Sequence, residues 1–80
     1  MPAMRVTIEL HDALRRFLPG GAREAAVSVA DGATVRDALV ELGMDLDEPW
    51  NAALDGRLAA PADRLREGSR LIVFSPIAGG

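Results

Sequence analysis

Hydrophobic and polar residues alternate along the first part of the chain. Between residues 4 and 11 this period of two predicts a half-buried strand. A second alternating stretch at residues 26–30, with Val27 and Val29 on its apolar side, predicts a strand that returns antiparallel to the first. Between them we expect one or two helical turns at residues 12–18, ended by a turn at Pro19-Gly20-Gly21. The expected apolar positions are Val6, Ile8, Leu10, Leu14, Phe17 and Leu18, and the polar side of the first strand carries Arg5, Thr7, Glu9 and His11.

The pattern then changes to a helical period. Apolar residues at i, i+3, i+4 and i+7 predict a buried stripe along a helix from about residue 34 to residue 42. Thr34 is a suitable N-cap, with Asp37 three residues later as its capping-box partner. Gly43 suits the left-handed residue that commonly follows a helix. The stripe consists of Val35, Ala38, Leu39 and Leu42.

The second half of the chain predicts three further strands. Two short strands at residues 50–54 and 57–59 flank Asp55-Gly56, a strong hairpin signal. After a coil anchored by Leu65, residues 70–74 form an apolar run that predicts a buried final strand. This order predicts an α+β fold of the β-grasp, or ubiquitin-like, type. We expect a mixed four- to five-stranded sheet with one main helix on one face and the first and last strands parallel in its middle.

The tail after the final strand is the candidate functional site. We divide the chain into a single domain, residues 1–74, and a flexible C-terminal tail, residues 75–80. Pro76 ends strand pairing, and Gly79 and Gly80 lack the Cβ atom that would keep them out of a narrow channel. Six extended residues span roughly 20 Å, enough to place a terminal carboxylate in another protein's active site. The alternative is a frayed terminus, the usual state of chain ends.

Composition narrows the classes of function. The chain of 80 residues has no cysteine, no lysine and a net charge of -3. It therefore has no disulfide and no thiol nucleophile, and its charge argues against a nucleic-acid partner. Because no apolar run is long enough to span a membrane and no signal peptide is present, we expect a cytoplasmic protein without a membrane partner. Asp45, Asp47 and Glu48 fit a solvated acidic turn better than a metal site, which needs more oxygen ligands, so we predict no metal.

Five segments together carry a family resemblance. They are Ala13-Leu14-Arg15-Arg16-Phe17-Leu18-Pro19, Gly32-Ala33-Thr34-Val35-Arg36-Asp37, Asp55-Gly56, Leu65-Arg66-Glu67-Gly68-Ser69-Arg70-Leu71 and, the most specific, Phe74-Ser75-Pro76-Ile77-Ala78-Gly79-Gly80. In these segments the chain resembles the MoaD/ThiS family of bacterial sulfur carriers over essentially its whole length. The tail is more similar to the small subunit of molybdopterin synthase, which usually ends Pro-Pro-Val-Ala-Gly-Gly, than to thiazole-pathway carriers. Three residues depart from the family's usual pattern: Ser75 for proline, Ser69 for aspartate and Asp55 for asparagine.

The resemblance implies a chemistry that the chain does not perform alone. An adenylating partner of the ubiquitin-activating kind would use ATP to convert the Gly80 carboxylate into an acyl-adenylate, and Gly79 would be needed for steric access. Sulfur from a persulfide donor would then give a thiocarboxylate. Its sulfur would be delivered inside a second enzyme, such as the catalytic large subunit of molybdopterin synthase. The chain has no nucleotide loop, so we expect it to bind no cofactor of its own.

Strand parity predicts a docking surface beside the tail. If Leu71 and Val73 face the helix, Ile72 and Phe74 face the opposite side, where His11 lies at the rim. We expect these residues, with Pro76 and Ile77 of the tail, to bind partners. The alternative is that Phe74 folds over its own sheet and Ile72 is an ordinary buried neighbour. His11 is expected to be exposed rather than catalytic, because no cysteine or second histidine accompanies it.

Three functions fit these features. The first is a sulfur carrier, most simply the small subunit of molybdopterin synthase, with thiazole or another thio-metabolite as the other acceptors. The second is a ubiquitin-like modifier, in which a lysine amine of a target attacks the same acyl-adenylate. The third is a non-covalent interaction module with an inert tail.

Overall fold

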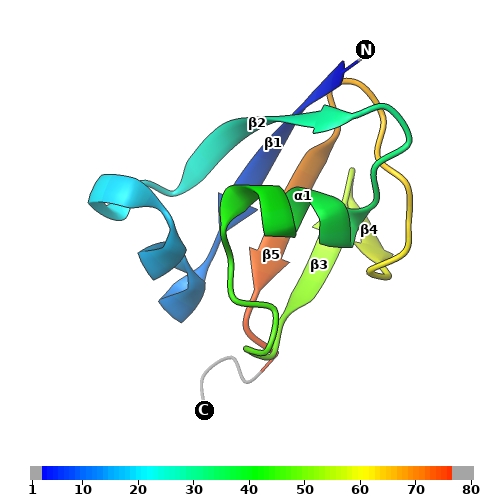
Figure 1. The fold of residues 1–80 in the computed structure, drawn as a ribbon. Coiled ribbons are helices and arrows are strands. Elements are labelled where there is room, and N and C mark those ends of the chain that lie inside the picture. Colours follow the sequence, from blue (N-terminus) through cyan, green and yellow to red (C-terminus); the bar gives the residue numbers. More distant parts are fainter. Residues whose placement is uncertain (1–2, 77–80) are drawn as a thin grey trace.

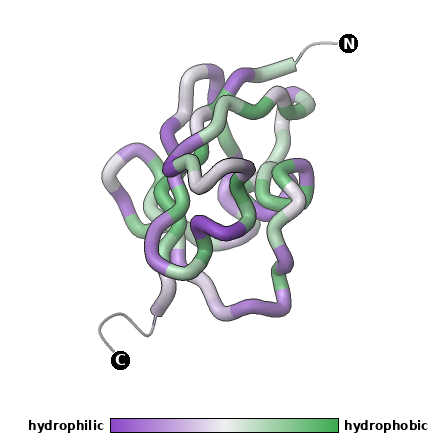
Figure 2. Tube along the Cα trace, turned by 90° about the vertical axis from the view of Figure 1, so that its left-hand side faces the viewer, coloured by the Kyte–Doolittle hydropathy of each residue, from purple (hydrophilic) through white to green (hydrophobic). Residues whose placement is uncertain are grey.

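A computed structural model describes residues 3–76 of the chain. Hydrophobic and hydrophilic residues alternate along much of it (Figure 2). Within residues 3–76, no helix is long and apolar enough to cross a membrane. The elements are β1 Ala3–Leu10, η1 Asp12–Phe17, η2 Pro19–Gly21, β2 Glu24–Ala30, α1 Val35–Leu42, β3 Asn51–Leu54, β4 Arg57–Ala59 and β5 Arg70–Phe74, where η marks a 3-10 helix.

The five strands form one mixed sheet in the order β2-β1-β5-β3-β4 (Figure 1). β1 and β5 are parallel neighbours in its middle, whereas β2 pairs antiparallel with β1 and β3 pairs antiparallel with both β5 and β4. The helix α1 lies across one face (Figure 1). The predicted β-grasp arrangement, including the parallel central pair, is confirmed.

Helix α1 begins and ends at the residues that the sequence indicates. The Thr34 hydroxyl accepts a hydrogen bond from the Asp37 backbone N–H at 3.2 Å, and the Asp37 carboxylate accepts one from the Thr34 N–H at 3.0 Å. This capping box satisfies two backbone donors at the helix start and lowers the pKa of Asp37. Gly43 follows the helix at φ 94°, the left-handed region that glycine adopts at low cost.

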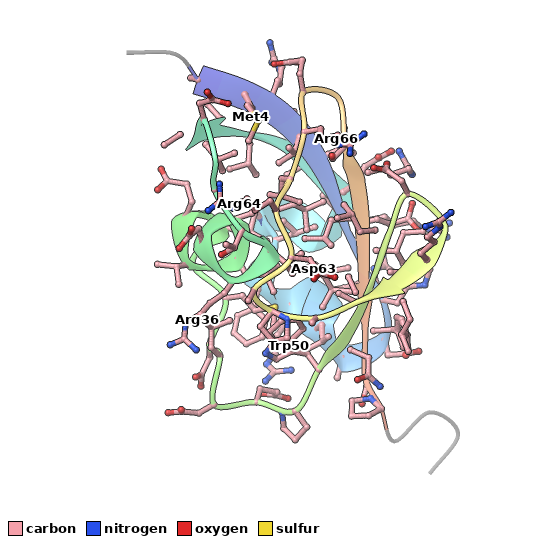
Figure 3. The ribbon with its side chains drawn as sticks, turned by 90° about the vertical axis from the view of Figure 1, so that its right-hand side faces the viewer. Met4, Arg36, Trp50, Asp63, Arg64 and Arg66 are labelled. Carbon is pink, nitrogen blue, oxygen red and sulfur yellow. The ribbon has the colours of Figure 1, made fainter. Side chains whose placement is uncertain are left out.

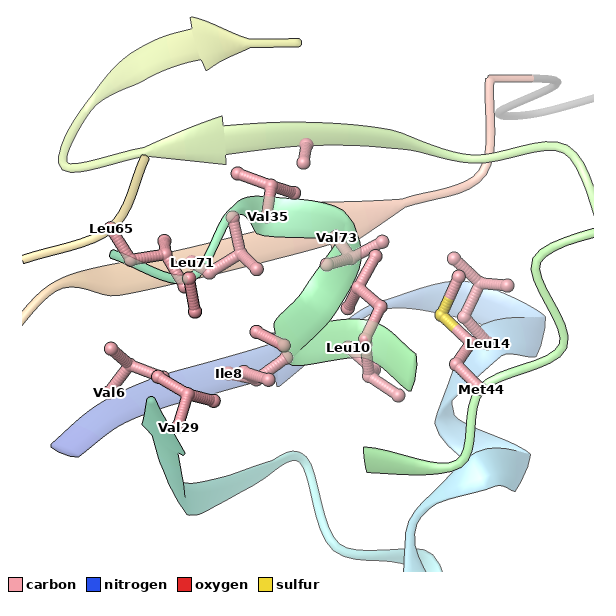
Figure 4. Close-up of a cluster of buried hydrophobic side chains, with 14 of the residues drawn as sticks. Val6, Ile8, Leu10, Leu14, Val29, Val35, Met44, Leu65, Leu71 and Val73 are labelled. Atoms are coloured by element: carbon pink, nitrogen blue, oxygen red, sulfur yellow. The ribbon is translucent and has the colours of Figure 1, made fainter. Parts of the chain in front are cut away.

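The core lies between α1 and the sheet (Figure 4). The inward residues of β1 and β5 meet Val35, Ala38 and Leu39 of the helix, all of which are fully buried. Leu42, the last residue of the predicted stripe, is only half-buried, so the end of the stripe is less buried than its spacing suggests. Phe17 is also half-buried, at the edge of this cluster. The inward strand residues are Val6, Ile8, Leu10, Leu71 and Val73.

The segment after β4 secures the first turn of α1. The carbonyl oxygens of Pro61 and Asp63 accept hydrogen bonds from the N–H groups of Arg36 and Val35, at 3.0 and 2.9 Å. Figure 3 shows Asp63 on this segment, near α1. Leu65, which the sequence predicts as an anchor, is buried at 4% exposure. The coil therefore provides acceptors for N–H groups that a helix start leaves without intrahelical partners.

Element boundaries differ from expectation by one or two residues, and one local geometry differs in kind. β2 begins at Glu24 rather than at residue 26, and β3 begins at Asn51 rather than at Trp50. The helical turns after β1 are of the tight 3-10 type, entered through Asp12 at φ 56°. A positive φ at a residue other than glycine is uncommon, and no composition signal marks it in advance.

Candidate functional site

The candidate site begins where β5 leaves the core. Leu71 and Val73 are fully buried, while Ile72 and Phe74 are half-buried on the opposite face of the strand. The predicted strand parity is therefore correct. The His11 backbone N–H donates to the Val73 carbonyl at 2.9 Å, which ties the end of β1 to the end of β5.

Phe74 is the last strand residue before the tail. Pro76, in the bend that follows β5, is exposed. Ile77, Gly79 and Gly80, the other tail residues to which the sequence assigns roles, lie outside the described residues. The base of the tail therefore sits beside the half-buried side chains of β5.

Strand pairing extends the apolar surface beyond β5. Ile72 pairs with Ala53 of β3, and Ala53 pairs with Leu58 of β4, so the three side chains follow one another across the sheet. Leu58 is 79% exposed, which is unusual for so large an apolar side chain. We name the surface formed by Ala53, Leu58, Ile72 and Phe74 the docking face.

The sequence predicts that Leu58 lies on an edge strand and does not indicate a role for it. The signal that could have found it is the two-residue turn at Asp55-Gly56, whose φ angles of 49° and 89° allow a tight hairpin. Such a turn fixes the register, so that Leu58 opposes Ala53. The parity of β4 follows from that register, and Leu58 then falls on the same face as Ile72.

A charged cluster borders the docking face. Glu9, opposite Ile72 across the β1–β5 pair, accepts hydrogen bonds from His11 Nε2 and from Arg70, the latter at 2.6 Å. Arg70 also pairs with Glu24 of β2 at 3.2 Å. The bond from His11 and then that from Arg70 lower the pKa of Glu9, while Glu9 raises the pKa of Arg70. A fixed ion cluster next to an apolar surface is suited to orienting a partner rather than to catalysis.

His11 belongs to this cluster as predicted for a rim residue. Its side chain is 48% exposed, and its neighbour Glu9 is a carboxylate rather than a nucleophile. The chain contains no cysteine to which the imidazole could act as a base. His11 is therefore an exposed residue at the rim, bonded to Glu9.

The acidic loop has structural contacts of its own. The Asp45 carboxylate accepts a hydrogen bond from the Asp47 backbone N–H at 3.0 Å, a local turn of the kind aspartate favours. Glu48 pairs with Arg16 of η1. Trp50 is half-buried against the core, as expected for a partial lid.

Two of the three departures from the family pattern keep their turns intact. Ser69 is buried, and its hydroxyl accepts a hydrogen bond from the Arg66 N–H at 2.9 Å. The Asp55 carboxylate accepts one from the Arg70 N–H at 2.9 Å. Serine and aspartate here offer side-chain oxygen acceptors, as the usual aspartate and asparagine also would. These substitutions therefore do not disturb the frame that carries the tail.

The topology and the exposed face of the sheet define a ubiquitin-like β-grasp protein. Residues 9–80 match the model of the ThiS family, and the chain belongs to this family. The resemblance to the MoaD/ThiS family is confirmed. No curated protein sequence matches the chain significantly.

Solved structures share the fold over nearly the whole chain. SAMP1 from Haloferax volcanii, a small archaeal modifier protein, is 27% identical with a TM-score of 0.76, covering 95% of this chain and 99% of its own. A candidate molybdopterin converting factor subunit 1 from Pyrococcus furiosus is 24% identical with a TM-score of 0.75, covering 92% and 99%. SAMP1 from Methanosarcina acetivorans is 17% identical with a TM-score of 0.72, covering all of both chains. The last two likenesses show the fold alone.

Proposed function

We propose that this protein is a sulfur carrier whose Gly80 is activated and converted to a thiocarboxylate by a partner enzyme. The observation that carries the proposal is the family match, which runs through residue 80 and so includes Gly79 and Gly80. The docking face supports the proposal, because its residue Phe74 is the last strand residue before the tail. A partner that holds this face would receive the tail at a defined place.

The chemistry requires activation because a carboxylate lacks a good leaving group. In the proposed first step the Gly80 carboxylate attacks the α-phosphorus of ATP on an adenylating partner and releases pyrophosphate. The terminal sulfur of a persulfide then displaces AMP from the acyl carbon, forming an acyl disulfide. A second thiol cleaves the S–S bond, which leaves the –COSH group on Gly80 and a disulfide on the donor side. The carrier contributes the acyl group, the reach of its tail and the surface that docks.

The acceptor that we favour is the molybdopterin precursor. The tail from Phe74 to Gly80 resembles that of the small subunit of molybdopterin synthase, and the candidate converting factor from Pyrococcus furiosus has the same fold. In this proposal the second partner is the catalytic large subunit, which binds the docking face and admits the tail. Because activation consumes ATP, we place the carrier in the cytoplasm. ATP is used by the activating partner and is not bound by this chain.

The proposal is tested by intact mass. The purified protein is incubated with its adenylating enzyme, ATP and a persulfide donor. A carrier gains about 16 Da, the difference between sulfur and oxygen, at its C-terminus. Co-purification from the native organism should recover a large partner that resembles the catalytic subunit of molybdopterin synthase. A protein that keeps its original mass under these conditions is not a sulfur carrier.

A second function, that of a protein modifier, is favoured by the similarity to one solved structure. The 27% identity to SAMP1 of Haloferax volcanii supports a protein modifier, in which a lysine amine of a target takes the acyl group from the adenylate. This chain contains no lysine, so it cannot form side-chain-linked chains with itself. Peptide mass spectrometry distinguishes the two functions. A modifier leaves its C-terminal peptide, residues 71–80 after tryptic cleavage at Arg70, on lysines of larger proteins, whereas a carrier yields only the thiocarboxylate.

A further inference from the structure

The two edges of the sheet differ in how well they are protected. β4 has three residues and begins with the charged Arg57, so it is a short edge of the kind that resists pairing with other chains. β2, at the other edge, has seven residues. From Ala25 to Ala30 it contains neither a charged residue nor a proline. β2 is therefore the edge that is open to an additional strand.

Backbone groups of β2 are directed outward at alternate residues. The Leu10 N–H donates to the Arg23 carbonyl at 2.9 Å, which fixes the phase of the β1–β2 ladder. Hydrogen bonds in an antiparallel pair recur at every second residue, so Ala25, Val27 and Val29 face β1. Ala26 and Ser28 consequently direct their N–H and C=O groups away from the sheet.

A groove with an acidic border lies beside this edge, between β2 and α1. Apolar residues form part of it: Val29 and Ala33 are buried, and Val40 of α1 is 59% exposed. Its charged residues are all carboxylates, namely Asp31, Asp37 and Glu41. Among the described residues that line the groove, none is basic.

We propose that this edge binds an extended, cationic segment of a partner protein as a sixth strand. Its backbone pairs with Ala26 and Ser28, an apolar side chain covers Val40, and Lys or Arg side chains approach Asp31 and Glu41. A second copy of this chain is a poor occupant. It would bring its own carboxylates against the same groove, and each copy carries a net charge of -3.

The proposed site is separate from the docking face. β1 lies between β2 and β5 in the sheet, so a strand on the β2 edge leaves Ile72, Phe74 and Leu58 uncovered. The protein could hold such a segment while a catalytic partner occupies the docking face. This inference does not depend on thiocarboxylate chemistry, and its test does not involve the tail.

The test is an NMR titration of the isotope-labelled full chain with short capped peptides. One peptide alternates valine and lysine, and its matched control alternates valine and glutamate. We expect the lysine peptide to shift the amide signals of Ala26, Ser28 and Val40 and to slow hydrogen exchange at the outward amides of Ala26 and Ser28. Binding should weaken as salt is raised. The glutamate peptide should not bind.

Two variants separate the backbone contribution from the charge contribution. Ser28→Pro removes an outward N–H without removing a ladder hydrogen bond, and it should weaken lysine-peptide binding about two- to tenfold. Glu41→Lys, on the exposed side of α1, should weaken it about two- to fivefold and remains informative should the proline variant fail to fold. Asp47→Lys makes the same charge change in the acidic loop and should leave peptide binding unchanged.

Four results would overturn the proposal. Three concern the titration: amide shifts centred on Ile72 and Phe74 instead of β2, equal binding of the two peptides, or no amide shift at saturating peptide. The fourth is self-association of the chain through β2, detected by sedimentation. The last would assign the edge to a second copy of the chain.

Discussion

At the scale of single residues, Phe74 and Leu58 show two ways in which the sequence determines the face of a proposed docking residue. Phe74 alternates with Leu71 and Val73 in one apolar run, so its face follows from local parity. Leu58 acquires its place only through pairing with Ala53, which itself pairs with Ile72. Its exposure of 79% follows from its place on the edge strand β4, on the face of the sheet away from α1, and leaves it available to the proposed interface.

Phe74→Ala should weaken binding to the adenylating partner by about 1–3 kcal/mol, because large apolar side chains at an interface commonly dominate its energetics. The fold should persist, since Phe74 is only half-buried. Calorimetric titration with the partner measures the loss. Val40→Ala, which truncates an exposed apolar residue on α1, is the matched control and should bind the adenylating partner as wild type does. Loss of folding in the Phe74 variant would assign the ring to the core instead.

Glu9 gives the fold a dependence on acid pH. His11 and Arg70 hold its pKa below the ordinary value of 4.5 in the folded state. The resulting stabilisation is therefore present above the pKa of the unfolded chain and is lost as the pH falls through the lower, folded value. Glu9→Gln should lower the free energy of unfolding at neutral pH and flatten its decline in acid. Urea unfolding across this range measures both, and equal acid slopes in the two proteins would contradict the assignment.

At the scale of elements, local sequence features specify both ends of α1. Its cap and its terminal glycine agree with the sequence, and three of the four residues of its predicted stripe are fully buried. The coil after β4 adds hydrogen bonds to its first turn that no local pattern predicts, because they join residues far apart in the chain. The helix therefore depends on packing against the sheet as well as on its own propensity.

Leu39→Ala should reduce the free energy of unfolding by about 2–5 kcal/mol, because it leaves a cavity at a fully buried position of the core. In a small domain this is a large share of the total stability. Val40→Ala, one residue further along the same helix, truncates an exposed side chain and should change stability little. Denaturant unfolding of the pair gives the comparison. Similar midpoints would mean that Leu39 is not part of the buried stripe.

The sequence predicts features that depend on neighbouring residues, and it does not predict contacts between residues that are far apart in the chain. Strand parity in β1 and β5, the capping box at Thr34 and the hairpin at Asp55-Gly56 are local, and each is confirmed. The ion pair between Glu9 and Arg70 joins residues that are 61 apart, so it depends on the completed sheet. The positive φ of Asp12 also depends on the joining of β1 to η1, which residue type does not reveal.

At the scale of the whole molecule, the parallel pair of β1 and β5 determines where the tail leaves the sheet. β5 pairs with a strand on each side and leads directly into the tail, so the reactive end proposed here follows a strand in the interior of the sheet. The docking face spans β5, β3 and β4, while the free β2 edge lies beyond β1. The surface proposed for a catalytic partner is thus separate from the edge proposed for a peptide.

Gly79→Val should abolish activation without changing the thermal midpoint. A β-branched side chain would enter a channel proposed to admit only glycine, and it restricts the backbone as well. Gly20→Val, in the turn of η2, is a useful contrast. Gly20 has a φ of 63°, so this variant should lose stability and yet be adenylated while it remains folded. Thiocarboxylation of the Gly79 variant at the normal rate would contradict the proposal that the channel admits only glycine at this position.

The most direct test of the central claim is ATP–pyrophosphate exchange by the adenylating partner with the tail altered by one residue. Deleting Gly80 withdraws the carboxylate by roughly 3.5 Å, and adding one alanine after Gly80 places a different carboxylate at the end. We expect both variants to fold as wild type does and both to lose exchange, together with the gain of about 16 Da. Exchange by the deletion variant at a rate comparable to wild type would contradict the account, because the C-terminal glycine would then not be the site of activation.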